Sequence, residues 1–324
     1  MYDAILKDDP FPIKALWIAR HNMINQIPNA GLVTAELVQR LDFIVVADLF
    51  MNASACYADI VLPACSFLEQ TDLLPPPMGM PGAHKYLQLQ QKAIEPLYEC
   101  RPDLEILQGL AEKMGFGEHF NQSAEEFIEL LLSSEHPSVA GITLEKLKEG
   151  PVEMRAYDAP TFSTPTGRLE FYAERPLESG QALPQYLEPL ESEQRPLASK
   201  YPLMFFSTHT RYRVHSVFAN VDWFTDLDPE PVLEMNPDDA EPRNIRDGDM
   251  VCVFNDRGRT KLKAKVHQGM RPGLVNTTQG WWPEHFIEGS HQNLTHSTTN
   301  QAQELVYEPN AALYDVLVEV EKIG

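Results

Sequence analysis

Two apolar runs between residues 41 and 63 constrain the fold of this chain more than any other part of its sequence. The first run, residues 43–47, ends at Asp48, which is the first charged side chain after five apolar residues. The second run, residues 60–62, stops at a proline. A short apolar run with a polar side chain directly behind it is typical of a strand buried on both faces of a parallel sheet. These runs therefore predict neighbouring strands of an α/β domain.

The segments before Asp48 complete the unit that a parallel sheet requires. Residues 13–19 form another apolar run, and residues 32–41 place their leucines and valines on one face of a helix. Strand, helix and strand in this order imply a right-handed crossover and parallel strands. Asn22 follows the first strand as Asp48 follows the second, so both side chains project from the same edge of the predicted sheet. Ligands of open α/β sheets bind at that edge.

The residue type of Asp48 allows two interpretations. A carboxylate beyond the end of a strand can accept two hydrogen bonds from a flat amidine-like edge, such as the N1–H and 2-amino group of guanine. Aspartate is also a common turn residue, and on residue type alone the turn-capping interpretation is favoured. A second polar residue on the same edge, Asn22, strengthens the case for a ligand-binding crevice.

Charge and composition exclude several classes of function. The 324 residues include 26 Lys and Arg against 47 Asp and Glu, and the net charge of −21 argues against nucleic acid or anionic membranes as partners. No apolar run reaches the roughly 18 residues of a membrane helix, so we expect no direct membrane insertion. Residues 1–20 do not resemble a signal peptide, so a cytoplasmic location is the default expectation, and the sequence indicates no other.

Neither the cysteines nor the histidines form a recognisable metal motif. The four cysteines include no C-x-x-C pair, so we expect no iron–sulfur cluster or zinc ribbon within this chain and interpret the thiols as reduced and structural. Two histidine pairs, one of them His291 with His296, lack metalloprotease spacing and are interpreted as hydrogen-bonded or surface residues. The sequence thus predicts no metal ligand.

From residue 201 onward the pattern changes to short strands separated by turns. Apolar segments recur at residues 203–206, 250–254, 260–266, 275–277 and 312–320. Such strands with Gly-containing turns between them favour a small closed barrel. We therefore predict a parallel, Rossmann-like α/β domain over residues 1–175, a linker rich in Pro, Glu, Ser and Gln over residues 176–200, and a β-barrel domain over residues 201–324.

The first predicted barrel strand is followed directly by Thr208, His209, Thr210 and Arg211. Two hydroxyls, an imidazole and a guanidinium in this place suit a phosphate, a pyrophosphate or a polar fused ring, because arginine binds oxyanions through two parallel hydrogen bonds. A surface turn is the alternative interpretation. The glycine-rich nucleotide loops G-x-x-x-x-G-K-[ST] and G-x-G-x-x-G are absent from the sequence.

Taken together, these elements resemble the C-terminal part of the molybdopterin oxidoreductases, the dimethyl sulfoxide reductase family that includes formate dehydrogenases, nitrate reductases and polysulfide reductases. The most specific segments are residues 57–63, YADIVLP, which look like the family's Y-A-D-hydrophobic-hydrophobic-L-P signature, and residues 162–172, which contain T-P-T-G-R. The other segments that carry the resemblance are residues 42–50, 101–107, 236–240, 245–249 and 293–295.

The resemblance implies a cofactor and a more detailed fold. The implied cofactor is a molybdenum or tungsten ion held by two molybdopterin guanine dinucleotides, and the implied barrel is a six-stranded double-psi barrel that lies over both pterins. The residues that fall at cofactor-binding positions are Asn22 and Asp48 for a guanosine, Thr208, Thr210, Arg211 and His215 for a pterin and the pyrophosphate, and Asn293 for the other pterin.

The resemblance also implies how the chain takes part in a reaction. The complete enzyme is expected to catalyse two-electron redox chemistry or oxygen-atom transfer. The family's iron–sulfur segment and its metal-ligating Ser, Cys, Sec or Asp have no counterpart here, so no catalytic residue is assigned and the chain alone is expected to be inactive. Its expected partners are an N-terminal portion or subunit of the same enzyme and an iron–sulfur electron-transfer subunit. The alternative is a non-catalytic truncated paralogue that binds or delivers the dinucleotide, or a gene remnant.

Overall fold

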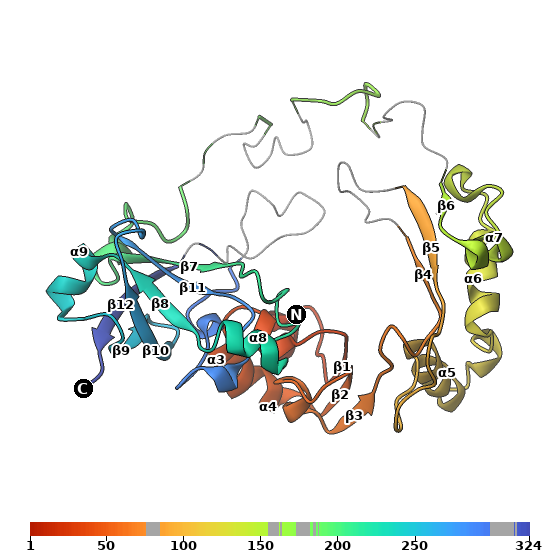
Figure 1. Ribbon diagram of the computed structural model, residues 1–324, viewed down its shortest axis with the longest axis horizontal. Coiled ribbons are helices and arrows are strands. Elements are labelled where there is room, and N and C mark those ends of the chain that lie inside the picture. The colour runs from red at the N-terminus through yellow and green to blue at the C-terminus, as the bar shows by residue number, and fades with distance from the viewer. Residues whose placement is uncertain are drawn as a thin grey trace. The chain divides into compact units, whose positions relative to one another are not determined.

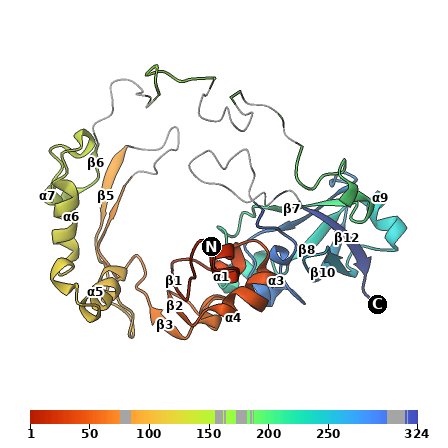
Figure 2. The same cartoon turned by 180° about the vertical axis from the view of Figure 1, so that it is seen from behind.

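The computed structural model describes residues 1–75, 85–154, 162, 164–172, 182–183, 186, 188–298, 314 and 316–324 (Figures 1 and 2). The chain forms two compact units. The first contains residues 1–46, 51–60 and 171–324, and the second contains residues 47–50 and 61–170. The N-terminal segment and the C-terminal barrel therefore belong to one unit.

The N-terminal segment forms the predicted parallel sheet. Its strand order is β1 (Ala15–Ala19), β2 (Phe43–Asp48) and β3 (Ile60–Pro63). Four successive residues of β2, from Ile44 to Ala47, are buried, as expected of a strand that is covered on both faces. The Asp59 carboxylate of the YADIVLP segment accepts a hydrogen bond of 2.7 Å from the Ile44 N–H, which explains why an acidic residue is placed there.

The helix between β1 and β2 differs from the uniform helix predicted over residues 32–41. Its middle turn is a π-helix, η1 (Val33–Leu37), in which Val33 and Leu37 are completely buried. The apolar face is the predicted one, because both residues still point into the core. The helices of this segment are α1 (Tyr2–Leu6), α2 (Met23–Gln26), α3 (Ala30–Leu32) and α4 (Val38–Arg40).

The C-terminal segment forms a closed six-stranded barrel, as predicted. Around the barrel the order is β10, β8, β11, β7, β12 and β9; β7 pairs with β11 and β8 with β10 in parallel, and the remaining neighbours are antiparallel. The strands are β7 (Leu203–Thr208), β8 (Val232–Met235), β9 (Met250–Phe254), β10 (Arg259–Val266), β11 (Leu274–Thr278) and β12 (Leu317–Lys322), with the short helices α8 (Asp222–Leu227) and α9 (Pro237–Ala240) between them.

Local sequence explains how the barrel closes around its core. Side chains of β10 are alternately buried and solvent-facing, so one face fills the interior beside Phe205 and Trp281. At the turn before β9, Gly248 has a φ of +83°, which favours glycine, and the neighbouring Asp247 carboxylate accepts a 2.9 Å hydrogen bond from the Val266 N–H.

The second unit packs three helices with a small antiparallel sheet. Its strands are β4 (Asp72–Leu74), β5 (Tyr86–Gln90) and β6 (Val152–Glu153), and its helices are α5 (Asp103–Lys113), α6 (Ala124–Leu132) and α7 (Leu144–Glu149). Leu87, Ile128 and Leu147 belong to its core. The predicted capping box at the start of α6 is confirmed, because Ser123 and Glu126 bond reciprocally.

The T-P-T-G segment of the second unit forms a turn. The N–H and hydroxyl of Thr166 donate to Glu170 Oε1 at 3.0 and 2.7 Å, and Gly167 has a φ of +65°. Among the described residues, no helix combines the length and the apolar character that a membrane crossing requires. The domain boundaries predicted at residues 175 and 200 stay predictions, and much of residues 176–187 lies outside the described part.

Candidate cofactor-binding site

Asn22 lies behind the carboxyl end of β1, as predicted, and is the N-cap residue of α2. Its side chain is buried, and its Oδ1 accepts hydrogen bonds from the N–H and the hydroxyl of Ser54 at 3.3 and 3.1 Å. Its Nδ2 has no partner among the described residues, and the same holds for Oδ1 of the buried Asn25. Buried polar atoms are normally paired, so these two amides indicate a place for a polar ligand or water.

The loop behind β7 carries four of the predicted site residues. Thr208 and Arg211 are exposed and Thr210 is half-buried, with its hydroxyl accepting a 3.3 Å hydrogen bond from the Tyr212 N–H. The guanidinium of Arg211 forms no ion pair within the described part of the chain, so it is available to an anion. His215 is exposed and has a φ of +50°, and its ring meets that of His209 edge-on at 5.6 Å between centroids.

A cavity of about 230 Å³ lies beside His215. Four segments of the first unit line it: α2 with Asn25 and Gln26, the loop behind β7 with His215 and Ser216, and two later loops that begin at Gln279 and His291. Hydrogen bonds join these walls, because Gln26 Nε2 donates to Ser216 Oγ at 2.9 Å and Gln292 Nε2 donates to the Gln26 carbonyl at 3.2 Å. A larger, shallower hollow beside Glu319 contains none of the predicted site residues.

Close packing around the cavity determines the charge of His291 and the choice of glycine at position 280. His291 is almost completely buried, which lowers its pKa to about 4 and keeps the imidazole neutral, and its Nδ1 has no partner in the described structure. The prediction that His291 lies on the surface is therefore wrong, and its Nδ1 atom is not hydrogen-bonded to any described residue. Gly280 has a φ of +95°, and a Cβ there would lie 2.0 Å from the His215 carbonyl oxygen, so only glycine permits this approach of two backbones.

Arg213, in the same loop, was not predicted as a site residue from the sequence. Its side chain is buried, forms an ion pair with Asp228 and lies over the Trp281 ring, with the guanidinium carbon 3.5 Å from the centroid. Burial lowers the pKa of the guanidinium, whereas the Asp228 carboxylate raises it. Arg213 thus anchors the loop to the barrel core, and the only sequence signal for it is a second arginine close to Arg211.

Asp48 and Asn293 both form hydrogen bonds with other residues of the described chain. Asp48 lies in the second unit, and its Oδ1 accepts hydrogen bonds from the N–H groups of Leu49 and Phe50 at 2.7 and 3.3 Å, as in a capped turn. Asn293 Nδ2 donates to the Arg259 carbonyl at 3.3 Å. Its neighbour in the chain, Gln292, lines the cavity, whereas Asn293 itself does not belong to the lining. Roles in guanine and pterin binding stay predictions for both residues.

The fold and the cavity together define a class of protein. A parallel α/β segment and a closed mixed barrel meet in one unit around a cavity walled by amides, a hydroxyl and imidazoles. Such a wall offers directed hydrogen bonds to a polar, ring-containing ligand, which is the kind of wall expected of a cofactor-binding protein.

Comparison with known proteins identifies the family. The molybdopterin oxidoreductase model matches residues 4–113, and the molybdopterin dinucleotide binding domain model matches residues 203–310. The dimethyl sulfoxide reductase DmsA of Escherichia coli is 33% identical to this chain, and DmsA of Haemophilus influenzae is 32% identical. Each alignment covers 84% of this chain. This chain belongs to the molybdopterin oxidoreductase family and is related to its dimethyl sulfoxide reductases, and the cofactor of the family is molybdopterin guanine dinucleotide with molybdenum.

The chain matches only part of these relatives, and a solved structure shares its fold. The chain covers 37% of each DmsA protein, so it spans less than half the length of these relatives. Acetylene hydratase from Pelobacter acetylenicus has the same fold, with a TM-score of 0.81 and 23% identity over 99% of this chain and 46% of that protein.

Proposed function

We propose that this chain is the cofactor-binding, C-terminal portion of a molybdenum or tungsten oxidoreductase with a bis-(molybdopterin guanine dinucleotide) cofactor. The observation that carries the proposal is the cavity beside His215, where Asn25 Oδ1 and His291 Nδ1 are buried without a partner among the described residues. A pterin dinucleotide presents ring N–H, amino, carbonyl and phosphate groups, which suit such atoms as donors and acceptors. The residues present therefore fit the cofactor.

Each predicted residue has a proposed task. Arg211 binds the pyrophosphate, with the hydroxyls of Thr208 and Thr210 and the ring of His215 as further hydrogen-bonding groups. Because the whole chain carries a net charge of −21, an anionic ligand is held by such local contacts against the overall field. Asn22 and Asp48 bind guanosine, with Asp48 on the base, and Asn293 binds the second pterin.

The complete enzyme is proposed to transfer two electrons or an oxygen atom. When bound, the cofactor supplies the metal at which this chemistry takes place, and the residues of this chain orient the pterins and set their electrostatic surroundings. The remaining portion or subunit supplies the metal ligand and an iron–sulfur cluster, and a separate iron–sulfur subunit carries electrons. On this basis the chain alone is inactive.

The double-psi form of the barrel belongs to the same proposal. Its support is the mixed pairing of the barrel. Strand β7 pairs in parallel with β11, and β8 pairs in parallel with β10, so in each parallel pair the two strands are not consecutive in the chain. Crossed parallel pairs of this kind keep the loops behind β7 and β11 on the same side as the cavity.

Calorimetric titration of the isolated chain with guanosine diphosphate tests the proposal, with adenosine diphosphate as the matched control. We expect saturable but weak binding of the guanine nucleotide, with a Kd of about 100 μM, because part of the cofactor-binding wall is supplied elsewhere. Absence of any preference for guanine would favour the paralogue or gene remnant that has lost the cofactor. Nanomolar, stoichiometric binding would contradict the idea that the wall is incomplete.

A further inference from the structure

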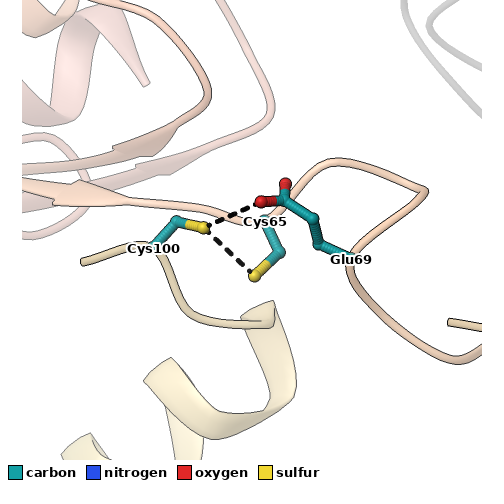
Figure 3. A group of neighbouring side chains, drawn as sticks. All are labelled: Cys65, Glu69 and Cys100. Carbon is teal, nitrogen blue, oxygen red and sulfur yellow. Dashed lines mark hydrogen bonds between the residues drawn. The ribbon is translucent and has the colours of Figure 1, made fainter. Parts of the chain in front are cut away.

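Three side chains of the second unit converge at a place that the proposed function does not use. They are Cys65, directly behind β3, Glu69 in the following turn, and Cys100, just before α5 (Figure 3). Backbone hydrogen bonds of 3.0 Å, from the Cys65 N–H to the Arg101 carbonyl and from the Arg101 N–H to the Pro63 carbonyl, hold the two cysteine-bearing segments together. Cys65 and Glu69 are each only 5% exposed.

The spacing of the three groups matches the edges of a tetrahedral metal site. Cys65 Sγ lies 3.5 Å from Cys100 Sγ, Cys100 Sγ lies 3.4 Å from Glu69 Oε1, and all three ligand atoms lie within 4.8 Å of one another. Tetrahedral zinc with bonds of about 2.3 Å to sulfur and about 2.0 Å to oxygen places its ligands roughly 3.5–3.8 Å apart. A disulfide would require the two sulfurs to approach to about 2.05 Å.

Backbone hydrogen bonds hold the carboxylate of Glu69 in one orientation. Its Oε2 accepts a hydrogen bond of 2.7 Å from the Ser66 N–H, and its Oε1 accepts one of 2.6 Å from the Leu97 N–H. The Oε1 atom also faces the sulfur of Cys100, as Figure 3 shows. Hydrogen bonds of this kind, from groups outside the ligand set, hold metal-binding carboxylates in place and tune their affinity.

The negative charge of Glu69 is stabilised by hydrogen bonds and not by an ion pair. Glu69 is buried, and no Lys, Arg or His of the described residues forms an ion pair with it. A bound cation would compensate this buried negative charge more fully than hydrogen bonds alone. Soft thiolates beside one carboxylate select zinc-like ions over magnesium or calcium.

We propose that Cys65 Sγ, Cys100 Sγ and Glu69 Oε1 bind one divalent thiophilic ion, represented by Zn²⁺, with water as the fourth ligand. On binding, the two thiols form two metal–thiolate bonds and release two protons to solvent, and no atom changes oxidation state. The ion adds a side-chain link between the end of β3 and the segment before α5, which the backbone hydrogen bonds of Cys65 and Arg101 already hold together. The proposal does not depend on the proposed function, because none of these three residues has a task in it.

Titration of the reduced, metal-free, full-length chain with Co²⁺ tests the proposal. We expect one equivalent of Co²⁺ to produce the d–d absorption of a tetrahedral site and thiolate-to-metal charge-transfer absorption. Zn²⁺ should displace the bound Co²⁺ and remove this absorption. About two protons should be released for each ion bound. These readouts use the unaltered protein, so they do not depend on whether a variant folds. A wild-type chain with titratable thiols but no such absorption would overturn the proposal, and so would a purified chain in which peptide mapping finds a permanent Cys65–Cys100 disulfide.

Co²⁺ binding by variants of the three residues tests whether they are the ligands. Cys65→Ser and Cys100→Ser are each expected to weaken Co²⁺ binding at least about 100-fold, and Glu69→Gln about tenfold, because each loses one metal bond. Cys56→Ser removes an exposed free thiol outside the cluster and is expected to leave the absorption unchanged. If Cys56→Ser abolished the absorption while Cys65→Ser kept it, the site would lie elsewhere and the assignment would be refuted.

Discussion

The guanidinium of Arg213 lies over the indole ring of Trp281, 3.5 Å from its centroid. Trp281 belongs to the barrel core, whereas Arg213 belongs to the loop that carries His215, so one stacked pair joins the core to the wall of the cavity. The same guanidinium also forms an ion pair with Asp228. The position of the loop is therefore set by the interior of the barrel.

Replacing Arg213 with alanine should destabilise the protein. The change leaves Asp228 without its partner and opens a space over Trp281, so we expect the free energy of unfolding to fall by about 3 kcal/mol. Urea denaturation measures the effect. Arg271→Ala, at an exposed position, is the matched control and should stay within about 0.5 kcal/mol of the wild type. Equal effects of the two substitutions would show that the buried pair does not anchor the loop.

Two glycine-to-alanine substitutions should have opposite effects. At Gly280 the added Cβ would meet the His215 carbonyl at 2.0 Å, so we expect unfolding to become easier by about 2 kcal/mol or more and guanine-nucleotide binding to weaken. At Gly109, inside α5, no atom lies within 4 Å of an added Cβ, and alanine should stabilise the chain by about 0.5–1 kcal/mol. Thermal and urea unfolding of both variants check this contrast.

Asp48→Asn separates the two interpretations of this residue. An asparagine Oδ1 can still accept the hydrogen bonds from Leu49 and Phe50, so the turn should remain and stability should change little. The charged acceptor for the guanine edge is lost, and we expect affinity for guanosine diphosphate to fall about tenfold. Calorimetry on both proteins measures it. Unchanged affinity would leave Asp48 as a turn cap alone.

The buried imidazole of His291 predicts a pH dependence of stability. Burial lowers its pKa from 6.5 to about 4, so between these values the unfolded chain binds a proton that the folded chain does not. The stabilisation is therefore fully present above pH 6.5 and decreases as the pH falls toward 4, by up to about 3 kcal/mol.

Urea unfolding at pH 7 and pH 5 measures this dependence. His291→Gln should reduce the difference between the two pH values, because glutamine does not titrate. His119→Gln, at an exposed position, is the control and should retain the wild-type difference. If both variants behaved alike, the pH dependence would have to come from other groups.

The sequence predicts those parts of the fold in which local pattern and tertiary environment agree. In the apolar run, Phe43 at its start is exposed, and Ile44 to Ala47 are buried because both faces of a strand inside a parallel α/β sheet are covered. Strand β8 was not predicted, because it is short and contains Glu234. In the structure this carboxylate is compensated by Asn276 at 2.9 Å and Lys265 at 3.0 Å from neighbouring strands, which no local pattern reveals.

The candidate site was predicted less completely than the fold. Asn22 was predicted from its position at the sheet edge and His215 from the family resemblance. Asn25, Arg213 and His291 were not predicted as site residues. The cavity depends on contacts such as that between Gln26 and Ser216, which are 190 residues apart, so its residues share no sequence spacing. Burial and unpaired atoms, which identify them, exist only in the folded chain.

The hydrogen bonds that join α2 to the distant loops around the cavity also determine when this site can form. Gln26 must meet both Ser216 and Gln292, and contacts between such remote segments form late in folding because long loops must close first. A ligand that requires these walls therefore binds only after the N-terminal segment has docked on the barrel. Binding of such a ligand would stabilise the docked arrangement over any form of the chain in which the N-terminal segment is detached.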